Sequence, residues 1–288
     1  MNAMQDIETP CTDREVVKVI DGVPTTDGAG VELTRVIGSP ELNMLDPFLL
    51  LDRFASDEPS DYIAGFPPHP HRGFETVTYL LQGRMRHKDS AGHEGVIEAG
   101  GVQWMTAGRG VIHSEMPEQE DGLLAGFQLW INLPAANKMD SAAYQEFSRD
   151  EIPVETRNSG VEARVVAGVT SRGTQGPVIQ PLTDPLYLDV SIPAGGAFTE
   201  ALPVGHNVFV LGIEGRTIIG RHELEREKLA ILGQGEAVSV TAGDEGARFL
   251  LVAGKPLREP VARGGPFVMS NAEEIRQAFA DYNNGALT

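Results

Sequence analysis

The sequence predicts an all-β protein made of two β-barrels, followed by one C-terminal helix. Runs rich in β-branched and aromatic residues recur along the 288-residue chain, and many of its 33 glycines and 19 prolines fall between them, as turns require. The two halves also resemble each other, since "VQWMTAGRG" near Val102 is echoed by "VSVTAGDEG" near Val238. Hydrophobic residues make up 41% of the chain, which is enough for a substantial core.

The predicted strands fall into two groups separated by a polar stretch. In the first half we expect strands at Val31–Ile37, Pro47–Phe54, Glu75–Gly83, Leu123–Pro134 and, on either side of Ala99-Gly100, within Gly95–Gly108. In the second half we expect them at Val161–Val169, Leu186–Ile192, Asn207–Gly215, Glu236–Gly243 and Ala247–Gly254. The intervening residues Ala135–Gly160 are expected to connect two domains, which we place at residues 1–150 and 151–288.

The last predicted element is a helix that begins near Ser270 and stops before Gly285. Ser270 and Glu273 have the spacing of a capping box. Three apolar residues then fall on one helical face, namely Ile275, Phe279 and Tyr282. We expect this face to pack on a sheet.

Charge and cysteine content restrict the function. The chain has 41 acidic and 23 basic side chains, a net charge of −18, which repels nucleic-acid phosphates and anionic membranes. Cys11 is the only cysteine, so no intrachain disulfide can form. The N-terminal stretch lacks the basic start and apolar run of a secretory signal. We therefore expect a cytoplasmic protein that binds neither nucleic acid directly nor membranes.

Two pairs of residues could build a metal site. His69 and His71 have the i, i+2 spacing that places both side chains on one face of a strand, and His113 and Glu115 repeat it. Three imidazoles and a carboxylate leave positions open on an octahedral ion, which suits Fe(II), Mn, Ni or Cu chemistry better than a closed zinc site. Glu75, four residues after His71, is an alternative fourth ligand if the chain stays extended.

Other candidate residues rank lower. We expect His87 and His93 to be solvated loop residues, and His206 and His222 to have core or surface roles. Core positions are expected for Trp104 and Trp130. We also expect core packing for Phe66, Met105 and Met116, although these residues could instead line a cavity near the metal.

The second half is not expected to bind a metal. When the turns at Thr106 and Thr241 are aligned, the counterparts of His113 and Glu115 are Arg248 and Leu250. Neither residue can replace an imidazole–carboxylate pair, so this half should be structural or serve as a binding surface.

The motifs resemble those of a known family. His69-Pro70-His71 with Glu75 is similar to the first cupin motif, and "TAGRGVIHSE" is similar to the second. The longer combination resembles the pirins, a family of bicupins, and the match extends to "RFASDEPSDYIAGF" and "GGPFVMSNAEEIRQAFADY". This resemblance implies two cupin barrels and one metal ion held by His69, His71, His113 and Glu115. Glu75 would then not be a ligand. Iron is the usual pirin metal, and Mn, Ni, Cu, Co or Zn are alternatives.

The resemblance also implies alternative functions. Several pirins resemble quercetin 2,3-dioxygenases, which open a flavonol ring with O2 and release carbon monoxide. We expect such a dioxygenase acting on quercetin-type flavonols, with Glu115 as the catalytic base that takes the proton of the substrate's 3-hydroxyl. Animal pirins are described as iron-dependent co-regulators, so the alternative is a non-enzymatic, redox-sensitive iron protein acting through a protein partner. A third possibility is a bicupin enzyme for another substrate.

Overall fold

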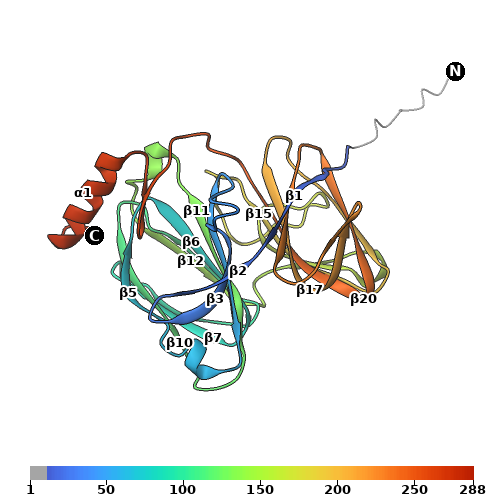
Figure 1. Cartoon of the computed structure of the whole chain (residues 1–288), viewed down its shortest axis with the longest axis horizontal. Helices are drawn as coiled ribbons and strands as arrows, with labels where there is room; N and C mark the ends of the chain where they lie inside the picture. Colours follow the sequence, from blue (N-terminus) through green and yellow to red (C-terminus); the bar gives the residue numbers. More distant parts are fainter. Residues whose placement is uncertain (1–11) are drawn as a thin grey trace.

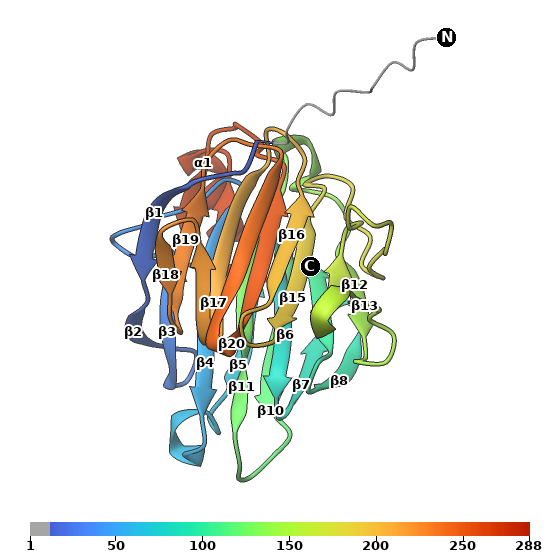
Figure 2. The same cartoon turned by 90° about the vertical axis from the view of Figure 1, so that its right-hand side faces the viewer.

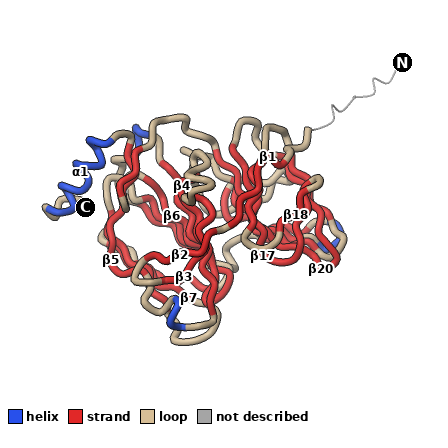
Figure 3. Tube along the Cα trace, viewed as in Figure 1, coloured by secondary structure: helices blue, strands red, loops and turns tan. Residues whose placement is uncertain are grey.

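The computed structural model describes residues 12–288, and Cys11 and the N-terminal stretch before it lie outside the described residues. Two β-rich bodies lie side by side, and the C-terminal helix lies at the outer end of the first body (Figure 1). Strands dominate both bodies (Figure 3). The prediction of a mainly β chain with two barrels and a C-terminal helix is confirmed. No helix within residues 12–288 is both long and apolar enough to cross a membrane.

The first barrel consists of a seven-stranded and a four-stranded antiparallel sheet. The larger sheet is formed, in spatial order, by β12 (Ala143–Phe147), β9 (Val102–Thr106), β6 (Phe74–Gln82), β11 (Leu124–Asn132), β4 (Phe48–Ser56), β3 (Val31–Ile37) and β2 (Val23–Asp27). The smaller sheet is formed by β5 (Phe66–His71), β10 (Val111–Pro117), β7 (Arg84–Asp89) and β8 (Glu94–Glu98).

The second barrel is one nine-stranded sheet that curls around an apolar interior. Its main path is β1 (Val16–Asp21), β19 (Lys228–Leu232), β17 (Asn207–Ile219), β20 (Ala237–Gly254), β15 (Leu186–Ile192), β14 (Glu162–Ala167) and β13 (Val154–Thr156). Two further strands pair outside this path, β16 (Ala197–Ala201) with β20 and β18 (His222–Leu224) with β17. Val165, Val210 and Phe249 are among the buried side chains that fill the interior.

The two ends of the described chain cross to the opposite bodies. Strand β1 pairs with β19 of the second barrel. The hairpin of β21 (Ala262–Gly264) and β22 (Phe267–Met269) and helix α1 (Ala272–Asn283) lie against the first barrel, where Arg72 pairs with Asp281 at 2.6 Å. The division near residue 150 stays a prediction, and this crossing is a feature that the sequence did not indicate.

The two barrels share an apolar core, and the strands of the second barrel lie in front of β4, β6 and β11 in Figure 2. Val77, Tyr79 and Trp104 enter this core from the first barrel, and Phe209 and Leu250 enter it from the second. The Tyr79 hydroxyl also donates to Asp189 at 2.7 Å. Strand β6 therefore has one face in the core between the barrels and its other face inside the first barrel. The core position expected for Trp104 is confirmed.

Two local predictions were wrong. The N-cap of α1 is Asn271, whose side chain accepts from the Glu274 amide at 3.0 Å, and Glu274 accepts in turn from the Ser270 amide. The capping pair is thus shifted one residue beyond Ser270 and Glu273, because Asn caps as well as Ser does. The stretch 135–160 is not only a connection, since it contributes β12 to the first barrel and β13 to the second.

Candidate metal centre

Three histidines converge inside the first barrel. His69 and His71 lie on β5, and His113 lies on the neighbouring β10 directly opposite His69. One ring nitrogen from each lies within 4.8 Å of the other two. His71 and His113 are buried and His69 is half-buried. The structure therefore brings together the three imidazoles that the i, i+2 spacing selected.

The hydrogen bonds of two of these histidines turn their free nitrogens toward each other. His69 Nδ1 lies 2.8 Å from the Pro67 carbonyl and His71 Nδ1 lies 3.2 Å from the Pro266 carbonyl. A carbonyl only accepts, so both protons are assigned to Nδ1 and both Nε2 lone pairs are free. These Nε2 atoms are 3.0 Å apart, an arrangement that a cation between them would stabilise.

His113 gives a second test of the fit to a metal ion. Both of its ring nitrogens are buried without a hydrogen-bond partner among the described residues. An unsatisfied buried imidazole is costly, and coordination of an ion would satisfy it. The three-histidine group therefore fits a metal ion.

The protonation states agree with ligation. Burial, assisted by the neighbouring His69, lowers the pKa of His71 to about 3. Burial, followed by the other imidazoles, holds the pKa of His113 well below its ordinary value. Both rings are therefore neutral at pH 7, which is the form that binds metals.

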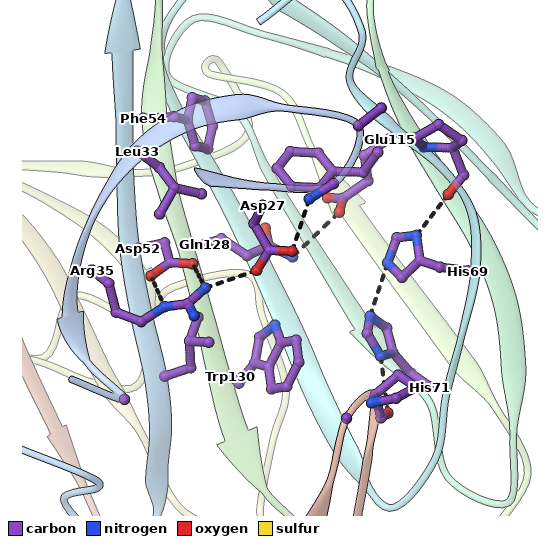
Figure 4. Close-up of a pocket in the computed structure, with 18 of the residues that line it drawn as sticks. Asp27, Leu33, Arg35, Asp52, Phe54, His69, His71, Glu115, Gln128 and Trp130 are labelled. Carbon is purple, nitrogen blue, oxygen red and sulfur yellow. Dashed lines mark hydrogen bonds and ion pairs between the residues drawn. The ribbon is translucent and has the colours of Figure 1, made fainter. Parts of the chain in front are cut away.

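Glu115 lies beside this group. Its strand, β10, has an irregular register with β5 between His113 and Glu115. The carboxylate is held inside the barrel by Thr78, whose hydroxyl donates at 2.6 Å, and by the Gln128 amide at 3.3 Å. Its oxygens are outside the group of mutually close ligand atoms, and the carboxylate lines the same cavity as His69 and His71 (Figure 4).

Glu75 points away from the histidines. Its neighbours Phe74 and Thr76 face the inside of the first barrel, whereas Glu75 faces the core between the two barrels. There its carboxylate accepts hydrogen bonds from Trp104 Nε1 at 3.1 Å, from the Thr106 hydroxyl at 2.6 Å and from the Gln180 amide. Burial raises its pKa to about 7. Of Glu75 and Glu115, only Glu115 thus shares a cavity with His69 and His71.

His69 and His71 lie at one end of a cavity of about 680 Å³, which is in the usual size range of ligand sites. Trp130 and Gln128 project into it between its two ends, and Phe54 and Leu33 form apolar wall (Figure 4). The core position expected for Trp130 is wrong, because this half-buried ring lines the cavity, with its centre 5.1 Å from that of His71.

Sequence reasoning missed the far end of this cavity. Arg35 and Asp52 form an ion pair there, and Asp27, which also pairs with Arg35, lies between this pair and His69 in Figure 4. Arg35 and Asp52 are polar residues within apolar strands, and this was the available signal. Gln128 shows the same signal in "FQLWIN", two residues before Trp130 on the same strand face.

The expectation of a solvated loop was wrong for His87. Strand β7 pairs with β10 so that His87 is opposite Glu115, and its side chain enters the barrel, where it is 1% exposed. It stacks on Tyr144 with ring centres 4.7 Å apart and hydrogen-bonds to Asp89 at 3.2 Å. His93, which bonds the same Asp89 at 2.9 Å, is partly exposed.

Comparisons with known proteins agree with this architecture. Residues 30–131 match the family model described as Pirin, and residues 187–288 match the Pirin C-terminal cupin domain. A pirin-like protein of Caulobacter vibrioides is 52% identical over 272 residues, covering 94% of this chain and 98% of the relative. A Pseudomonas aeruginosa protein provisionally named as a quercetin 2,3-dioxygenase is 49% identical over 280 residues, covering 95% and 98%. The crystal structure of a quercetin 2,3-dioxygenase from Acinetobacter baumannii has a TM-score of 0.87 at 34% identity, covering 96% of this chain and 98% of that one.

Proposed function

The chain belongs to the pirin family, and we propose that it is a metal-dependent dioxygenase that cleaves quercetin-type flavonols with O2. The observation that carries the proposal is the convergence of three buried or half-buried imidazoles, two of which line one end of a cavity with aromatic walls. The similarity to a solved quercetin 2,3-dioxygenase supports the choice of reaction. Fold similarity alone would not, because one fold serves many activities.

We assign His69, His71, His113 and Glu115 as the residues that hold the ion. We take Fe(II) as the first candidate from the family resemblance, and Mn, Ni, Cu, Co and Zn as alternatives. When bound, the ion supplies Lewis acidity toward the flavonol 3-hydroxyl oxygen and redox capacity toward O2. The Pro67 and Pro266 carbonyls fix the His69 and His71 rings in the required tautomer.

Glu115 is the proposed base of the reaction. Thr78 and Gln128 hold its carboxylate at the cavity surface, where it can take the proton of a substrate hydroxyl. The ring of Trp130 offers a flat apolar face to a planar aromatic substrate. Phe54 and Leu33 keep the surroundings of the substrate apolar, which strengthens the interaction of the carboxylate with the hydroxyl.

The test is carbon monoxide release and O2 uptake with quercetin, on protein of measured metal content loaded in turn with each candidate metal. The wild type is compared with His69→Ala, and His222→Ala in the second barrel serves as the matched histidine control. We expect turnover that follows bound metal, disappears in His69→Ala and is unchanged in His222→Ala. Absence of carbon monoxide from protein fully loaded with every candidate metal would contradict the proposal and favour a metal-binding protein that acts through a protein partner. We also propose that the protein is located in the cytoplasm, as the sequence led us to expect.

A further inference from the structure

The cavity contains a built polar group that extends from its far end, at Arg35 and Asp52, toward the histidines, at Asp27. Arg35 on β3 donates to both carboxylate oxygens of Asp52, at 2.8 and 2.6 Å, and to Asp27 at 2.8 Å. The side chain of Asp52 is only 5% exposed, whereas that of Asp27 is 53% exposed. Asp27 is therefore the member of this group that can meet a ligand in the cavity (Figure 4).

The charge of this group selects the kind of ligand. Burial raises the pKa of Asp52 to about 6, which leaves its carboxylate ionised at pH 7, and the group contains two carboxylates and one guanidinium. A ligand carboxylate or phosphate placed directly against Asp27 would be repelled by its carboxylate, although Arg263 also lines the cavity. A hydroxyl group can instead donate to Asp27, because an ionised carboxylate accepts about four hydrogen bonds and the protein supplies two.

Asp27 is held in position before any ligand arrives. It begins the turn between β2 and β3, and this turn rests on the start of β5. The Ala29 amide donates to the Gly65 carbonyl at 3.1 Å, and the contact is so close that a Cβ at Gly28 would lie 2.6 Å from the Phe66 ring. This contact and the Arg35 ion pair fix the Asp27 carboxylate at the cavity edge. Little conformational entropy of this side chain is therefore lost when a ligand binds.

We infer that Asp27, positioned by Arg35, determines substrate specificity by accepting hydrogen bonds from ring hydroxyls of the substrate other than the 3-hydroxyl. The inference rests on the proposed function and deepens it, because it distinguishes polyhydroxylated flavonols from flavonols that carry only the 3-hydroxyl. Trp130 lies between the two ends, so one planar ring system can reach both.

The experiment compares the affinities of metal-loaded protein for quercetin and for 3-hydroxyflavone, which keeps the 3-hydroxyl and lacks the other ring hydroxyls. Titrations follow the absorption band of the flavonol under anaerobic conditions. We expect the wild type to prefer quercetin, and Asp27→Ala to lose about 10- to 100-fold of that preference, the range for hydrogen bonds to a charged acceptor. Asp27→Asn keeps the shape of the side chain and should lose part of the preference.

The control variant is Glu32→Ala, which removes an exposed carboxylate from the same β2–β3 hairpin outside the cavity lining, and the preference should survive in it. Equal affinities of the wild type for the two flavonols, or an unchanged preference in both Asp27 variants, would overturn the inference. This test can be distinguished from the test of the proposed function. Metal-loaded protein that binds quercetin through Asp27 but releases no carbon monoxide would contradict only the dioxygenase activity.

Discussion

Replacing Glu75 with glutamine tests how a buried carboxylate affects stability and whether it takes part in metal binding. The Glu75 side chain is fully buried between the two barrels, where it accepts hydrogen bonds from Trp104, Thr106 and Gln180. Burial raises its pKa from an ordinary value of 4.5 to about 7. The folded protein therefore binds this proton more tightly than the unfolded chain does.

The sign and size of the effect follow from this shift. The proton stabilises the folded state fully below pH 4.5, and the stabilisation is lost as the pH rises through about 7. At 1.36 kcal/mol per pKa unit, the wild type should lose about 3 kcal/mol of unfolding free energy across this window. Glu75→Gln has no proton to release at this position, so this loss should be absent from the variant.

The assay is urea unfolding of both proteins at several pH values from 4.5 to 8, the window set by the ordinary and folded-state pKa values of Glu75. Other titrating groups, including the histidines, contribute equally to both proteins and cancel in the difference. Glu120→Gln, in an exposed turn, is the control and should run parallel to the wild type. Parallel curves for Glu75→Gln would refute the reasoning. Metal content should also be unchanged in Glu75→Gln, and its loss would make Glu75 a ligand.

Three further predictions concern other parts of the molecule. Glu115→Gln should keep most of the bound metal and lose carbon monoxide release, and full turnover would exclude the proposed base. Trp130→Ala should weaken flavonol binding about 10-fold through lost ring stacking and apolar contact, as measured by absorption titration, with metal content unchanged. Asp281→Asn should destabilise the docked helix by about 1 kcal/mol, because the buried Arg72 loses its charged partner and Asp281 is partly solvated. Proteolysis near α1 should then become faster, and an unchanged rate would count against that role.

Much of the fold could be predicted because runs of β-branched and aromatic residues bounded by glycine and proline indicate strands directly. The limits appear where short segments depend on distant partners. Residues 16–21 form a strand only by pairing with β19, more than 200 residues away, and β12 is an edge strand with a polar sequence. The sequence VVKVID of residues 16–21 has four β-branched residues and is a strand signal that we overlooked, whereas β12 carries little local signal and depends on its neighbouring strand.

The site shows the same limit at finer scale. The i, i+2 rule placed His69 and His71 correctly because β5 is continuous across both. Extending the rule to Glu75 failed because the chain turns at Gly73, whose φ of 87° ends β5 and starts β6 in another sheet. His87 was missed for a related reason, since only the pairing of β7 with β10 shows which face of β7 is inside.

The turn at Gly73 in turn depends on the end of the chain. A Cβ at this position would lie 2.0 Å from the Val268 carbonyl, so only glycine permits the approach of β22. The buried Lys138 ammonium joins the same two segments, donating to the Gly73 carbonyl at 2.8 Å and to the Val268 carbonyl at 3.1 Å. The neighbouring Pro266 carbonyl orients the His71 ring. The geometry of the histidine group is therefore completed by a segment almost 200 residues beyond it, and the crossing of the C-terminal segment to the first barrel is part of how this group is built.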